Sequence, residues 1–210
     1  ALDGVSPDAD WYRYLLNVLT QRDVDTFRSQ ARKFAIITFN FDRSFEWALF
    51  SMLQDRFGLT ATQARTLAME VDIHHVHGVL GDPDWLLPGP DSNPFGCANR
   101  VALETAVRRA VTKINIVDED IPKSVVEDLL VPLTNADFVY FLGFGFEERN
   151  ILRLNLPDCL KNTAVVRATC LGKTTLEMTS ARGRLKGPHL YHDDDARTFL
   201  RERAESLFDD

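Results

Sequence analysis

FAIITFNFDRSFE, residues 34–46, is the stretch of sequence that decides how the chain folds. Its first six residues do not alternate between apolar and polar, which predicts a strand covered on both faces in a parallel sheet. Beyond Asn40 the apolar side chains recur at helical spacing, at Phe45, Ala48, Leu49, Met52 and Leu53. The stretch therefore predicts a strand, a short polar turn and a helix.

The polar turn of this stretch is the first place to look for function. In such a unit the turn lies at the carboxyl end of a strand, where open α/β sheets bind their ligands. The turn contains Asn40, Asp42 and Arg43. We therefore expect a ligand site at these residues, in a protein of the α/β class.

Size and charge narrow the possible classes of function. A chain of 210 residues and 23.8 kDa predicts one domain over residues 1–210, with residues 80–135 as an insertion of loop and helices. A hydrophobic content of 45% and a charged content of 26% are ordinary for a globular protein. The net charge of −7 argues against non-specific nucleic-acid binding, which needs a positive surface. A small anionic ligand remains compatible, because backbone N–H groups at a helix start can bind it.

The cysteines and the hydropathy pattern bear on location. Cys97, Cys159 and Cys170 lie far apart and form no CxxC pair, so neither a zinc ribbon nor a disulfide framework is indicated. No apolar run approaches the roughly 18 residues that a membrane span needs. The sequence shows no signal peptide, which predicts a cytoplasmic protein without membrane contact. The chain begins at Ala1 rather than Met, which suggests a trimmed or partial sequence.

The second informative stretch is VDIHHVHG, residues 71–78. Its alternation predicts a strand that Gly78 ends. His74 and His75 are expected to be hydrogen-bonded structural residues. A metal site is the alternative, because His75 and His77 would point the same way on a strand, but no matching cluster of other ligands is evident and no metal is expected. His77 is the candidate general base, because the pKa of imidazole needs little adjustment near neutral pH.

The segment LGDPDWLLPGPDSNPFGCAN, residues 80–99, holds four prolines and three glycines and predicts a long loop. Trp85, Leu86 and Leu87 are candidates for a lid over a ligand, although packing against the body of the protein is the simpler expectation. Helices are expected on either side of the acidic turn at residues 118–120.

The stretch FVYFLGFGF, residues 138–146, predicts the same order of elements as the opening stretch: an apolar strand, a turn that here contains glycines, and then a helix. Gly143 and Gly145 would let backbone amides approach a phosphate or a sugar, and tight packing is the other explanation. A further buried strand is expected at residues 163–171, followed by Gly172-Lys173-Thr174-Thr175. Arg167 stands where a phosphate loop needs its first glycine, which excludes a Walker motif.

Taken together and in this order, ITFNFDRSFE, HVHG and FLGFGFEERNI resemble the sirtuin-like NAD-binding domain of the bacterial type that hydrolyses NAD, often in antiviral defence systems. The resemblance covers residues 11–171. It implies a Rossmann-like three-layer fold, with a mostly parallel sheet and helices on both faces. It also implies NAD as substrate or ligand, and further domains or subunits as partners.

The resemblance assigns site residues to this chain. Asn40 and Asp42 would lie beside the nicotinamide and its ribose, with Asn40 and His77 catalytic. Gly143, Phe144 and Gly145 would form the turn that faces the ribose and the phosphates. An uncharged amide can orient water or the carboxamide without trapping the cation that develops on the sugar. Asp42 could stabilise that positive charge or fix a neighbouring side chain, and the second role is favoured because a carboxylate close to a backbone turn is often structural.

Two departures from the family keep alternatives open. The first strand with its glycine-rich turn has no counterpart before Trp11, so the chain is cut, lacks segments or has lost part of the NAD site. The four-cysteine zinc module of deacetylating sirtuins is also absent, which makes NAD-dependent protein deacylation the less favoured activity. NAD hydrolysis is the first expectation, and a non-catalytic module that senses NAD or ADP-ribose, or serves as a scaffold, is the second.

Overall fold

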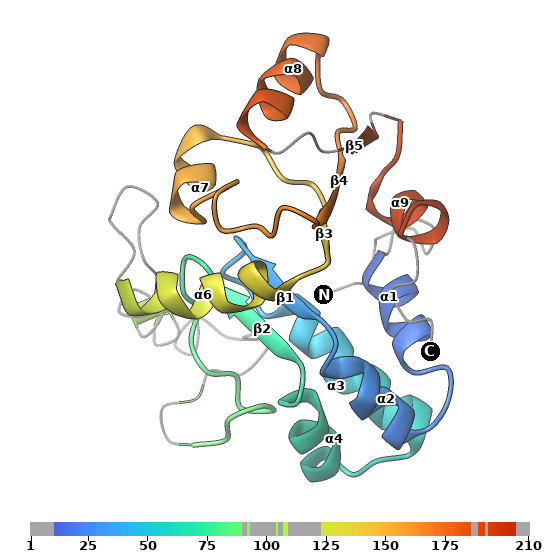
Figure 1. Ribbon diagram of the computed structural model, residues 1–210. Coiled ribbons are helices and arrows are strands. Elements are labelled where there is room, and N and C mark those ends of the chain that lie inside the picture. The colour runs from blue at the N-terminus through green and yellow to red at the C-terminus, as the bar shows by residue number, and fades with distance from the viewer. Residues whose placement is uncertain are drawn as a thin grey trace. The chain divides into compact units, whose positions relative to one another are not determined.

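The structure, a computed structural model, describes residues 11–89, 92, 104, 107–108, 123–185, 189–191 and 193–204, without the side chains of 123–125 and 189. The chain divides into two compact units. Unit 1 comprises residues 1–5 and 15–121, and unit 2 comprises residues 6–14 and 122–210. Both contain helices and short parallel strands, which confirms the α/β class (Figure 1).

Unit 1 is built on a pair of parallel strands, β1 (Ala35–Thr38) and β2 (Asp72–His75). Their register pairs Ala35 with Asp72 and Thr38 with His75. All four residues of β1 are half-buried, so the prediction of a strand covered on both faces was wrong in that respect. Within the described part of the chain β1 pairs only with β2.

The helices of unit 1 are α2 (Val24–Ala31), α3 (Ser44–Phe57) and α4 (Ala61–Ala68), together with the last turns of α1 (Trp11–Leu19). Their ends follow local chemistry. Gly58 ends α3 with a φ of 62°, a left-handed conformation that glycine adopts without steric cost. Thr60 and Gln63 form a reciprocal capping box that begins α4.

The core of unit 1 is formed by apolar side chains from these helices and from the end of β2. The buried members include Leu16, Leu19, Phe27, Leu49, Leu53, Leu67 and Val76. Trp85 and Leu86 are buried as well, and the Trp85 ring lies 5.2 Å from the ring of Trp47 on α3. Packing was therefore the correct interpretation of the aromatic end of this loop, whereas Leu87 is exposed.

Unit 2 contains a parallel three-stranded sheet in the order β3 (Phe138–Phe141), β4 (Val165–Thr169) and β5 (His189–Tyr191). Its helices are α6 (Lys123–Asn135), α7 (Glu148–Arg153), α8 (Thr175–Arg184) and α9 (Ala196–Glu202). Figure 1 shows α7 and α8 following the carboxyl ends of β3 and β4. The buried residues include Phe141, Ile151, Val166, Ala168 and Phe199.

Some predicted boundaries differ from the structure. β2 ends at His75, because the backbone already turns there: Gly78 has a φ of 73° and its N–H donates to the His75 carbonyl at 3.2 Å. His77 therefore lies in a turn, just beyond the strand. Helix α8 was not predicted. Most of the helix expected before the acidic turn, and the turn itself, lie outside the described residues.

Candidate functional site

The polar turn after β1 is fixed by short hydrogen bonds. The N–H of Asn40 donates to Thr38 Oγ1 at 3.1 Å, and the N–H of Ser44 donates to Asp42 Oδ1 at 2.9 Å. Asp42 thus satisfies a free backbone N–H at the start of α3, as capping carboxylates do. The contact is structural, but the group that Asp42 holds is a backbone N–H and not the neighbouring side chain that was expected. Asn40 itself is exposed.

His77 lies at the matching place after β2. Because β1 and β2 run parallel with Thr38 opposite His75, Asn40 and His77 each follow a paired residue by two positions. The N–H of Val76 still donates to the Thr38 carbonyl at 2.9 Å, so the two segments remain hydrogen-bonded to each other just beyond the paired strands. The structure therefore brings Asn40 and His77 to the same edge of the sheet.

The His77 side chain is packed rather than open. The residue is 5% exposed, and its ring meets the ring of Phe39 edge-on, with 5.6 Å between the ring centres. An imidazole in such surroundings keeps a fixed orientation, which suits a general base and suits a structural residue equally.

A buried charged cluster lies beside these two residues. The Nε2 atom of His75 is 2.7 Å from Glu46 Oε1, and its Nδ1 atom is 2.8 Å from the carbonyl oxygen of Asn40. Arg43 donates to the same Glu46 oxygen at 2.8 Å. The expectation that His75 is a hydrogen-bonded structural residue is confirmed. Glu46 was missed, although its place three residues after Arg43 on a helix start was a signal for such a pair.

Glu46 carries the negative charge of this cluster. Burial by itself raises the pKa of the Glu46 carboxyl, but the hydrogen bond and positive charge of His75, together with the hydrogen bond from Arg43, outweigh burial and hold the pKa below its ordinary value. The carboxylate is therefore ionised at neutral pH. Asp82 adds a second carboxylate, 3.8 Å from Arg43.

The segment after His77 returns to the polar turn. The N–H of Leu80 donates to the carbonyl of Phe41 at 2.9 Å, which ties residues 80–82 to the turn. The Arg43 to Asp82 pair lies next to this bond. The turn at Asn40 is thus held by β1, by β2, by the start of α3 and by the loop after His77.

In unit 2 the predicted glycine turn follows β3. Gly143 has a φ of 63°, and its N–H donates to Thr169 Oγ1 at the end of β4. Three phenylalanine rings pack around the turn, those of Phe141, Phe144 and Phe146, with ring centres 5.1–6.1 Å apart. Phe144 is thus part of an aromatic cluster. Gly145, by contrast, adopts no left-handed conformation, and a Cβ added there would meet only Glu147 Cγ, at 3.8 Å.

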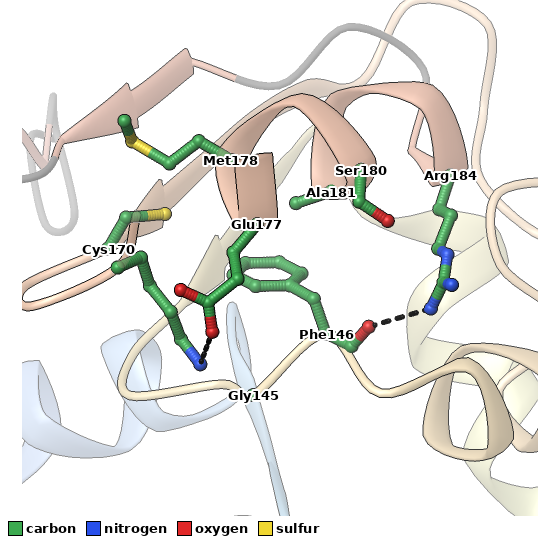
Figure 2. A pocket seen from close by; sticks show the side chains of 9 residues that line it. Gly145, Phe146, Cys170, Glu177, Met178, Ser180, Ala181 and Arg184 are labelled. Atoms are coloured by element: carbon green, nitrogen blue, oxygen red, sulfur yellow. Dashed lines mark hydrogen bonds and ion pairs between the residues drawn. The ribbon is translucent and has the colours of Figure 1, made fainter. Parts of the chain in front are cut away.

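Gly145 lines a pocket of about 190 Å³, which lies wholly within unit 2. Figure 2 shows that Gly145 and Phe146 enter it from the turn after β3, whereas Glu177, Met178, Ser180, Ala181 and Arg184 come from α8. Ligand clefts commonly measure about 300–1,000 Å³, so this pocket can hold a small group but not a whole dinucleotide.

Two cations border the pocket, and both already contact protein groups. Lys173 lies 3.7 Å from Glu177, and Arg184 donates to the Phe146 carbonyl at 3.2 Å. Sequence reasoning missed this pocket because it missed α8. The signal was the Thr174-x-x-Glu177 pattern of a capping box, which the structure forms.

Among the described residues, no group of three His, Cys, Asp or Glu side chains is arranged to hold a metal ion. No helix in the described ranges is long and apolar enough to cross a membrane. In comparisons with protein-family models, with curated proteins and with solved structures, nothing matches this chain.

Proposed function

We propose that this protein hydrolyses NAD⁺ at the bond between nicotinamide and ribose. The observation that supports the proposal is the placement of Asn40 and His77 at the carboxyl ends of two adjacent parallel strands, where α/β sheets bind nucleotides. An amide and an imidazole in such a position match the residues that the sirtuin-like resemblance implies. The Rossmann-like arrangement of the chain is part of the same proposal.

The side chains of Asn40 and His77 can perform the steps that this reaction requires. Water adds to the ribose carbon while the bond to nicotinamide breaks, which gives nicotinamide, ADP-ribose and a proton. Positive charge develops on the sugar as the neutral base leaves. The Asn40 amide would orient the water or the carboxamide, and His77 would accept a proton from the water or from a ribose hydroxyl. General base catalysis of this kind contributes about 10²–10⁴-fold.

For unit 2, taken by itself, we propose that the glycine turn after β3 contacts a ligand of the NAD class. The open space around Gly145 would let a ligand approach the backbone closely. The pocket that Gly145 borders could hold one small part of the ligand. For Asp42 we propose a contribution through the turn that it caps.

The direct test is chromatographic measurement of nicotinamide and ADP-ribose released from NAD⁺ by the purified protein. Turnover is expected in the wild type and is expected to fall by about 10²-fold or more in Asn40→Ala and His77→Ala. Matched controls are Asn17→Ala, an exposed asparagine on α1, and His74→Ala, the neighbouring histidine. Undiminished turnover in both site variants would remove the proposal.

A second function has an observation in its favour. His77 is 5% exposed and packs on Phe39, as a structural histidine would. A module that binds NAD or ADP-ribose without turnover would use the same residues. It would show a ligand-dependent rise in melting temperature and no release of nicotinamide.

A further inference from the structure

We propose that His75 is a positioning residue for the NAD reaction: as an imidazolium it binds the Asn40 carbonyl and the Glu46 carboxylate at once, and so fixes the turn that presents Asn40. The functional half of this statement rests on the proposed NAD hydrolysis. The structural half, which concerns a doubly protonated ring and the turn that it holds, stands on the geometry of unit 1.

The geometry requires two donors on one ring. Nδ1 faces the backbone oxygen of Asn40 at 2.8 Å, and Nε2 faces Glu46 Oε1 at 2.7 Å. A carbonyl and an ionised carboxylate can only accept hydrogen bonds. A neutral imidazole has one N–H, so its other nitrogen would direct a lone pair at an oxygen that can only accept. Only the imidazolium satisfies both contacts.

Burial raises the energetic cost of a contact between two hydrogen-bond acceptors. The side chains of His75 and Glu46 are 5% and 6% exposed, so water has little access to either. The charged groups that meet this pair, among the residues that the structure describes, are Arg43 from the turn and, through Arg43, Asp82 from the following loop. With two cations and two carboxylates, the charges of the cluster balance when His75 is protonated. Such a network is stable when every member is satisfied.

The cluster acts on Asn40 through the backbone. The Asn40 N–H is bound to Thr38 at the end of β1, and its carbonyl is bound to His75 at the end of β2. Both backbone groups of Asn40 are therefore held by the sheet, and neither bond uses its side-chain amide. A displacement of about 1 Å at a reacting group can cost on the order of 10²-fold in rate.

Loss of the His75 proton should release the turn. One of the two bonds then becomes a contact between acceptors, and the carbonyl of Asn40 is the partner that can move away, since Glu46 keeps Arg43. The expected signature is lower turnover whenever the ring is neutral.

The first experiment needs no activity. In the wild type with ¹⁵N-labelled histidine, nuclear magnetic resonance should show both ring nitrogens of His75 protonated at pH 7, with the signal assigned by its loss in His75→Gln. The ¹³C resonance of the Asn40 carbonyl should then shift over the same pH range in which the ring loses its proton. A neutral His75 tautomer at pH 7 would overturn the inference. So would an Asn40 carbonyl resonance that does not change while the ring loses its proton.

The second experiment separates positioning from simple stability. His75→Gln should lower kcat for nicotinamide release by roughly ten- to a hundredfold and leave KM within about twofold, because the affected group acts at the reacting bond. His74→Gln is the matched control, since it makes the same change at a histidine whose Nε2 atom meets Asp72 at 2.9 Å. Equal kcat in wild type and His75→Gln would overturn the positioning role. If the wild type releases no nicotinamide, the proposed function fails, and the resonance experiment alone decides the structural half.

Discussion

The N–H of Gly143 donates a hydrogen bond of 2.9 Å to Oγ1 of Thr169, which joins the glycine turn after β3 to the end of β4. Thr169 is 5% exposed, and its hydroxyl is also 3.5 Å from the carbonyl of Phe141. One buried hydroxyl therefore sets the path of the turn between two strands of unit 2.

The first prediction removes this hydroxyl. Thr169→Val keeps the shape of the side chain but takes away the acceptor, and we expect a loss of about 1 kcal/mol in the free energy of unfolding. Urea denaturation followed by circular dichroism measures it. Thr179→Val, at an exposed threonine of α8, is the control and should change stability by no more than about 0.5 kcal/mol. An equal effect of the two substitutions would show that the hydrogen bond between Gly143 and Thr169 adds no measurable stability.

The second prediction separates the two glycines of the same turn. Gly143 has a φ of 63°, where a side chain is strained, so Gly143→Ala should destabilise unit 2 by about 1 kcal/mol. Gly145 has ordinary backbone geometry and room for a Cβ, so Gly145→Ala should leave stability within about 0.5 kcal/mol.

The useful readout of Gly145→Ala is ligand binding. If the backbone at Gly145 approaches NAD, the added methyl group should weaken binding at least about tenfold, as measured by calorimetry, while the melting temperature stays unchanged. Unchanged affinity would place the ligand elsewhere than at Gly145.

The third prediction concerns the stability of unit 1. Glu46→Gln leaves His75 and Arg43 facing each other without their shared anion, and a buried pair broken in this way costs about 3 kcal/mol. The pKa of Glu46 is lower in the folded than in the unfolded protein. The contribution of the ionised carboxylate to the free energy of unfolding is therefore complete above the unfolded pKa, and it disappears as the pH falls through the folded pKa. The difference in stability between wild type and Glu46→Gln should therefore be largest near neutral pH.

Denaturant unfolding at a series of pH values checks this dependence. The difference should shrink as the pH falls below 4.5, the ordinary pKa of the group. Glu127→Gln, at an exposed carboxylate of α6, should show neither the loss nor its pH dependence. A difference that grew on acidification would contradict the assignment of Glu46 as the anion of the cluster.

The sequence predicted the parts of this structure that depend on neighbouring residues. The apolar run before Asn40 became β1, and the helical spacing after it became α3, because both follow from local periodicity. Gly58 ends one helix and Thr60 begins the next, and such caps are readable from sequence because they depend on a few adjacent groups.

The parts that depend on contacts between distant residues were not predictable in this way. His75 and Glu46 are 29 positions apart, and only the register of β2 beside β1 brings them within hydrogen-bonding distance. The bond between Gly143 and Thr169 spans 26 positions. Periodicity reports which side of an element is apolar, but it does not report which polar residues meet across two elements.

The last prediction concerns Cys170, which lines the pocket of unit 2 and is 2% exposed. Burial raises the pKa of the Cys170 thiol, and the nearby charges of Lys173 and Arg182 offset that effect only in part. Because the thiolate is the reactive form, Cys170 should resist iodoacetamide at pH 7 and react only when denaturant unfolds the unit. Ser180→Cys, at an exposed position on the rim of the same pocket, should react promptly. Peptide mapping by mass spectrometry distinguishes the two sites. Rapid labelling of Cys170 in the folded protein would mean that the pocket opens to reagents of this size, and that the thiol is available to a ligand there.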